Sequence, residues 1–139
     1  SLLDVSCTKS PSRCMAVGGW KNSAGEQFTL AYRFNGSSTW TLQSTPNPYG
    51  SSENRFQDVS CATETSCTAA GISVDGGGRT QTLAQEWNGT SWSIKGTPNP
   101  AGAAFGGLFG VSCQGTTCMG AGWSTDGSGV DTTLAELQE

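Results

Sequence analysis

The chain has 139 residues, of which 13% are charged, and a formal net charge of −4 at neutral pH. This length suffices for one domain with a hydrophobic core. The seven Lys and Arg residues are scattered, so nothing indicates nucleic-acid binding. No segment resembles a transmembrane span or a signal peptide, so we expect no membrane insertion and a mature or trimmed chain. Abundant glycine and the absence of a helical apolar period predict an all-β protein.

Four short strands are predicted at the start of the chain. The first two are expected at residues 2–7 and 14–18, joined by a hairpin. The third, at residues 28–34, alternates apolar side chains toward one face. Asn35-Gly36 then predicts a tight turn, because both residues tolerate a positive φ. The fourth strand begins near Trp40 and ends at Thr-Pro-Asn-Pro, because proline cannot continue a central strand.

This group of strands is repeated along the chain. A Val-Ser-Cys motif occurs three times, and each copy is followed by a second cysteine and a run of small residues. The first cysteines of the copies lie 54 and then 52 residues apart. Such a period indicates one supersecondary unit copied, with each copy needing a neighbour to bury its apolar face. Within a single domain at residues 1–139, we assign repeats to 2–55, 56–107 and, as a partial copy, 108–139.

The six cysteines form three close pairs, one in each repeat. If the flanking strands form a hairpin, the two sulfurs face each other across it, which suits a disulfide. A zinc site is the competing interpretation, but the chain has no histidine and the spacings are wider than Cys-x-x-Cys. Disulfides indicate an oxidising compartment, so we expect a secreted, extracellular protein. The predicted bridges are Cys7–Cys14, Cys61–Cys67 and Cys113–Cys118.

Four antiparallel strands in about fifty residues, repeated, are typical of β-propeller blades. We therefore predict an all-β, propeller-like fold with two full blades and one partial blade, and a β-trefoil is the alternative. The motifs Val-Ser-Cys, Trp-Asn-Gly and Thr-Pro-Asn-Pro together resemble repeats of secreted actinobacterial proteins, over nearly the whole chain. That resemblance implies a propeller-like architecture and, in some arrays, a binding role, but no particular activity.

The number of blades predicts an assembly. Two blades and most of a third cannot close a ring, since propellers usually have four to eight. The third repeat stops after Thr133-Leu134-Ala135-Glu136, with no following tryptophan, so Val111 and Leu134 have neither a fourth strand nor a next blade. Either the chain is a fragment of a longer array, or identical chains complete the ring. We predict a homodimer of about six blades in which the third repeat of each chain packs on the first repeat of the other.

A tryptophan beside glycine and polar residues follows the second strand in two of the three repeats. A flat aromatic face with fixed hydrogen-bonding groups is what a sugar site requires. The alternative is that these tryptophans pack between blades, which Ile72 in the second repeat favours; Trp40, Trp87 and Trp92 are expected in the core. The carbohydrate-binding residues that we predict are Trp20, Asn22, Asp75, Trp123 and Asp126.

Two loops rich in aspartate and glycine, at residues 75–78 and 126–131, offer oxygen ligands of the kind that calcium prefers. Residues 73–77 also partly resemble the Asp-box of sialidase-type propellers, but depart from it after Gly78. A polar turn with glycines at positive φ explains both loops without a metal. We therefore predict neither a metal nor a cofactor.

Catalytic chemistry finds little support in the sequence. The chain has no histidine to act as a base, and paired cysteines provide no thiolate. No acidic residue stands in an apolar setting expected to raise its pKa. Asp4 and Asp58 recur at one position, where the third repeat has Gly110, which favours a local turn or strand-end role. We predict a non-catalytic, lectin-like module, with a structural or protein–protein interaction module as the alternative.

Overall fold

The computed structural model describes residues 1–9 and 12–138. That part of the chain is all-β, as predicted, and contains no helix. Its strands are β1 (Leu2–Lys9), β2 (Ser12–Lys21), β3 (Gln27–Phe34), β4 (Trp40–Gln43), β5 (Glu53–Thr63), β6 (Ser66–Val74), β7 (Thr80–Trp87), β8 (Trp92–Lys95), β9 (Ala103–Gln114), β10 (Thr117–Asp126) and β11 (Asp131–Gln138).

The strands form three antiparallel meanders, in which each strand pairs with the next along the chain. We call them sheet 1 (β1 to β4), sheet 2 (β5 to β8) and sheet 3 (β9 to β11). A single parallel bridge between Gln27 and Glu53 connects sheets 1 and 2. No sheet in the described residues closes into a barrel.

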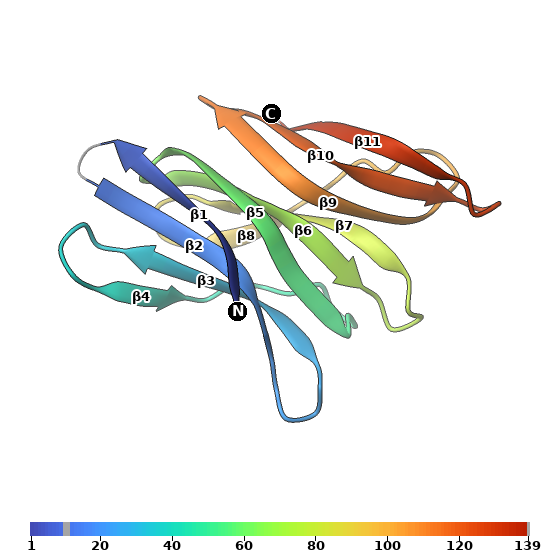
Figure 1. Ribbon diagram of the computed structural model, residues 1–139, viewed down its shortest axis with the longest axis horizontal. Helices are drawn as coiled ribbons and strands as arrows, with labels where there is room; N and C mark the ends of the chain where they lie inside the picture. The colour runs from blue at the N-terminus through green and yellow to red at the C-terminus, as the bar shows by residue number, and fades with distance from the viewer. Residues whose placement is uncertain (10–11, 139) are drawn as a thin grey trace.

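The three sheets are stacked in chain order, with sheet 2 between the other two (Figure 1). β5 packs against β1 and β2, whereas β9 packs against β5, β6 and β7. A smaller apolar cluster, Ala70, Leu108 and Leu134, lies between sheets 2 and 3, with Val111 packed against it. The expectation that Val111 and Leu134 lack a covering blade is therefore wrong, because sheet 2 of the same chain covers them. The larger core lies between sheets 1 and 2 and contains Met15, Val17, Ala31, Phe56, Val59, Cys67, Ala69, Leu83, Trp87 and Trp92.

A glycine follows the small residues of each second strand, and its recurrence has a steric cause. At Gly18, Gly71 and Gly122, a Cβ atom would overlap a backbone carbonyl in or directly before the neighbouring first strand. The first strand is irregular at this point in all three sheets, because one residue bulges out of the pairing register. The recurring glycine therefore lets the bulged strand approach closely.

The three predicted disulfides are confirmed. Each joins residues that lie directly opposite each other on the first and second strands of one sheet: Cys7–Cys14, Cys61–Cys67 and Cys113–Cys118. No cysteine in the described chain is free. Such bridges are typical of oxidising, extracellular environments. No helix of the described residues is long and apolar enough to span a membrane.

The predicted core tryptophans are only partly confirmed. Trp87 and Trp92 are buried between sheets 1 and 2. The position of Trp40 in the repeat also predicts a core residue, but 44% of its surface is exposed. That expectation is wrong because Trp40 lies on the side of sheet 1 that no other sheet of the described chain covers.

Candidate functional site

The main candidate surface is the face of sheet 1 that points away from sheet 2, which we call the open face. Side chains alternate along a strand, so the neighbours of the buried residues Met15, Val17 and Ala31 project to this side. Its exposed apolar members are Val5, Trp20, Trp40 and Leu42, and its partly buried members are Phe28, Leu30, Tyr32 and Phe34. A contiguous apolar surface of this kind is typical of an interaction site.

The open face is hollowed beside Trp20. The indole stacks on Phe28 with ring centroids 5.0 Å apart and an interplanar angle of 28°. The adjoining groove has a volume of about 460 Å³. Its walls are mostly apolar on β3, and Leu42 of β4 adds to them. They are polar at the Thr-Pro-Asn-Pro segment, where Thr45 and Asn47 line the groove.

The same repeat positions are covered in sheet 2. Val59 takes the place of Val5 in its repeat, and Trp92 takes the place of Trp40. Val59 is 4% exposed and Trp92 is 5% exposed, because sheet 1 packs on them. The open face is therefore built like the face of sheet 2 that forms the interface with sheet 1.

Trp20 and Trp123, which the sequence suggested as equivalent, occupy different positions in their repeats. Trp20 pairs with Phe28 across the sheet, whereas Trp123 pairs with Thr133. Counted from the second cysteine, Trp20 stands one residue later than Trp123, so the two side chains project to opposite faces of their sheets. Trp123 is half-buried, and a Cβ on Gly107 would lie 3.0 Å from its Nε1 atom.

Three of the predicted ligand residues take one place in three equivalent hairpin turns. Each Oδ1 atom accepts hydrogen bonds of 2.8–3.0 Å from the backbone N–H groups two and four residues later. A glycine at φ of 80° to 85° completes each turn. No hydrogen bond or ring contact in the described residues joins them to Trp20 or Trp123. These residues are Asn22, Asp75 and Asp126, and each shapes its own turn.

An unexpected contact joins sheet 1 to sheet 2 along their first strands. Asp4 Oδ2 accepts a hydrogen bond of 2.9 Å from the N–H of Val59. Two residues further, Ser6 Oγ accepts one of 3.0 Å from the N–H of Cys61. Side chains of β1 thus satisfy N–H groups on the free edge of β5, which protects that edge.

The same contact recurs between sheets 2 and 3. Asp58 Oδ2 accepts a hydrogen bond of 2.6 Å from Val111 N–H, and Ser60 Oγ accepts one of 3.0 Å from Cys113 N–H. The recurring aspartate therefore does more than the local role expected for it, since its carboxylate also binds the next repeat. The sequence signal for this contact between repeats was an Asp-x-Ser pattern in the first two repeats. The third repeat lacks the pattern, because Gly110 occupies the position of Asp58.

The two aspartates also contact each other. Asp58 Oδ1 accepts from the N–H of Val59 at 3.0 Å, the same N–H that Asp4 binds. Burial, together with the hydrogen bond to Asp4 and the charge of Asp4, raises the pKa of Asp58 from 3.8 to about 6, against the hydrogen bond from Val111. Burial also acts to raise the pKa of Asp4, but its hydrogen bonds lower the pKa overall. The expectation that no acid has a raised pKa is therefore wrong.

The arrangement of Asp4 and Asp58 differs from that of a catalytic carboxyl pair. Glycosidases hold their two carboxyl groups about 5 Å apart or more, so that a sugar or a water fits between them. Asp4 and Asp58 instead hydrogen-bond to each other and to edge N–H groups of the following sheets. The pair therefore joins the sheets.

The Thr-Pro-Asn-Pro motif also has a structural role. Thr29 on β3 is buried and contacts Thr45 Oγ1 at 2.8 Å, while its N–H donates to Asn47 Oδ1 at 3.0 Å. The second repeat has the equivalent contact of 2.6 Å between Thr82 and Thr97. The motif therefore fastens the segment after the fourth strand to the third strand.

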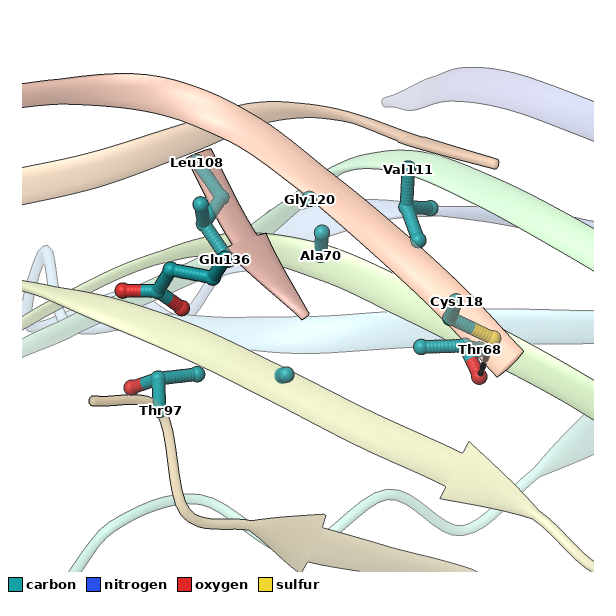
Figure 2. Close-up of a pocket in the computed structure, with 9 residues that line it drawn as sticks. Thr68, Ala70, Thr97, Leu108, Val111, Cys118, Gly120 and Glu136 are labelled. Atoms are coloured by element: carbon teal, nitrogen blue, oxygen red, sulfur yellow. Dashed lines mark hydrogen bonds between the residues drawn. The ribbon is translucent and has the colours of Figure 1, made fainter. Parts of the chain in front are cut away.

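A second buried carboxyl group lies between sheets 2 and 3. Glu136 is buried, and neither of its oxygens has a hydrogen-bond partner in the described residues. Burial raises its pKa. A cavity of about 10 Å³ adjoins it, with Thr97 and Leu108 nearby (Figure 2). Gln85 takes this place in sheet 2, where its Nε2 donates to the Pro46 carbonyl at 2.7 Å, a bond that an ionised Glu136 is unable to make.

The structure brings together no group of three or more acidic or cysteine side chains able to hold a metal ion, within the part of the chain that it describes. No protein-family model matches the chain, and no curated protein matches its sequence. The open face and the contacts between sheets are therefore the structural features that bear on function.

Proposed function

We propose that the protein is a secreted, non-catalytic binding module whose sheets are propeller-like blades, two complete and one partial. Meanders that stack face to face in chain order support blades over a β-trefoil, which requires strands from all its units to share one barrel. Among the described residues, the strands of sheets 1 and 2 pair only at the bridge between Gln27 and Glu53. The disulfides and the resemblance to secreted actinobacterial repeats support secretion.

The observation that carries a binding role is the match between the open face and the covered face of sheet 2. Val5 and Trp40 on the open face are 53% and 44% exposed, although their equivalents in sheet 2 are buried under a neighbouring sheet. A surface with the composition of an inter-sheet interface is best suited to bind a β-sheet of another protein chain. We therefore favour a protein–protein interaction module.

The test is a binding screen with immobilised protein against extracellular proteins and glycans. Val5→Lys places a charge on the open face. Val130→Lys serves as a matched control, because Val130 is equally exposed but lies in the turn between β10 and β11. The proposal expects every specific ligand to be lost with Val5→Lys and kept with Val130→Lys. Ligands that Val5→Lys retains would contradict it.

Carbohydrate remains the second candidate ligand, for one specific reason. The half-exposed Trp20, stacked on Phe28 beside a groove with polar residues, provides a flat apolar surface of the kind that sugars stack on. On a glycan array, Trp20→Ala should then abolish the hits. Trp123→Ala should leave them unchanged, because Trp123 lies on another sheet and away from the groove.

A further inference from the structure

We propose that the partner of the open face is sheet 3 of a second copy of this chain, in a reciprocal contact that repeats the internal interface between sheets. This inference rests on the proposed function and names its partner. Inside one chain, each sheet lays its outward side on the equivalent face of the next sheet, first between sheets 1 and 2 and then between sheets 2 and 3. In the described residues, no sheet covers the open face of sheet 1 or the outward side of sheet 3, which are the two remaining halves of this interface.

The outward side of sheet 3 has the composition of a covered surface. Met119 takes the place of Met15 in its repeat, yet Met15 is 2% exposed and Met119 is 48% exposed. Leu137 is exposed at the position where the earlier repeats carry the charged residues Arg33 and Glu86. A strand with one solvated face normally alternates apolar and polar residues, but β11 is apolar at Ala135 and Leu137 on its outward side as well.

The open face supplies the matching half. Val59, which packs in one cluster with Met15, corresponds to Val5, and Trp87 in that cluster corresponds to Phe34. In the assembly, Met119 of one copy packs against Val5 of the other copy. This contact repeats the packing of the equivalent residues Met15 and Val59 within a chain. The positions on both faces that correspond to this cluster are uncharged, so their burial requires no ion pair.

The edge contacts predict one new hydrogen bond at this junction. Ser6 and Ser60 accept from the N–H groups of Cys61 and Cys113 in the next sheet. The equivalent pair across two copies is Ser112 Oγ and the N–H of Cys7. The aspartate bond has no counterpart, because Gly110 replaces the aspartate. The junction between copies therefore has one of the two edge bonds found within the chain.

Sheet 3 of each copy packs on the open face of the other copy, so two such junctions bury both free faces of each chain. The expected assembly is therefore a closed dimer of about six blades. Native mass spectrometry of the disulfide-intact chain at low micromolar concentration tests it. The wild type and Val130→Lys should be dimers. Val5→Lys and Met119→Glu should each be monomers, because each places an unpaired charge in both junctions of a dimer.

The decisive measurement is native mass spectrometry of an equimolar mixture of the Val5→Lys and Met119→Glu variants. A heterodimer of these two variants has one junction with wild-type residues on both sides. In its other junction, the lysine introduced in one chain opposes the glutamate introduced in the other, so the two new charges pair. The mixture should therefore recover a heterodimer that neither variant forms with itself. A wild-type monomer, face variants that dimerise like the wild type, or a mixture without heterodimer would each overturn the proposal.

Circular dichroism and disulfide mapping show whether each variant is folded, and Ser112→Ala provides a milder change. It should raise the dimer Kd by about thirtyfold without altering the monomer, because it removes one hydrogen bond from each of the two junctions. If the wild type stays monomeric while the screen finds a protein partner that Val5→Lys loses, this inference fails and the proposed function stands. If ligands bind regardless of Val5→Lys, the proposed function itself fails.

Discussion

The open face of sheet 1 and the covered face of sheet 2 carry related residues at equivalent positions and have opposite environments. The valine of the Val-Ser-Cys motif is 53% exposed as Val5 and 4% exposed as Val59. The tryptophan of the fourth strand is 44% exposed as Trp40 and 5% exposed as Trp92. The repeat motif therefore encodes a surface complementary to a preceding sheet, and the presence of that sheet decides whether the surface is core.

The largest expected difference between the two faces is at the tryptophans. Trp92 packs against Phe56 and Trp87, with ring centroids 5.8 and 6.0 Å away. Trp92→Ala should lower the free energy of unfolding by about 3–5 kcal/mol, because it leaves a cavity in the main core. Trp40→Ala should lower it by about 1 kcal/mol or less in the monomer. Chemical denaturation of both variants in the monomeric Val5→Lys background measures the difference, and equal losses would contradict the comparison.

The next effect concerns the buried carboxyl group of sheet 3. Burial raises the pKa of Glu136, so the folded state holds its proton more tightly and loses stability as the pH rises through the folded pKa. Glu136→Gln removes the charge and provides an N–H like that of Gln85. It should stabilise the protein by about 1–2 kcal/mol at neutral pH and little at acidic pH. Thermal unfolding at both pH values measures this, with the exposed Glu53→Gln as a control; a destabilised Glu136→Gln would refute the explanation.

A smaller difference in monomer stability is expected between the edge serines of sheets 2 and 3. Ser60→Ala removes the acceptor of the Cys113 N–H and should cost about 1 kcal/mol of monomer stability. Ser112→Ala should leave monomer stability unchanged, because no sheet follows sheet 3 in the described chain. Urea denaturation of the two variants makes the comparison. A loss at Ser112 as large as that at Ser60 would show that the serine acts within its own sheet.

The smallest expected effect is the pH dependence of the aspartate pair. Because burial and the neighbouring Asp4 raise the pKa of Asp58 from 3.8 to about 6, its contribution to stability is complete below the lower value and is lost as the pH rises between the two. The group is half-exposed, so solvent screening reduces the loss to less than about 1 kcal/mol. Asp58→Asn should flatten the stability profile over this range. Unfolding curves at closely spaced pH values measure this, and an unchanged slope would show that another group titrates there.

The local structure could be predicted from the sequence because local chemistry determines it. The cysteine spacing predicted all three bridges, since half-cystines beside a hairpin turn face each other. Alternating apolar residues and the proline motif placed the strands of the first repeat to within a few residues. The tight turn expected at Asn35-Gly36 is instead a loop over residues 35–39, in which Gly36 has a positive φ and Asn35 does not. The equivalence of Trp20 and Trp123 was misleading, because a shift of one residue along a strand reverses the face.

The contacts between repeats depended on the tertiary structure. The sequence shows that Asp4 and Asp58 recur, but a carboxylate that binds an N–H group 55 residues away, as Asp4 does with Val59, leaves no local sign of its partner. The environments of Trp40 and Trp92 likewise differ only because one has a sheet packed on it. The sequence by itself determined the repeat, the strands and the disulfides, since these follow from residues close in the chain. The stacking of the sheets decided which copy of each motif is buried, because burial depends on the neighbour that the fold supplies.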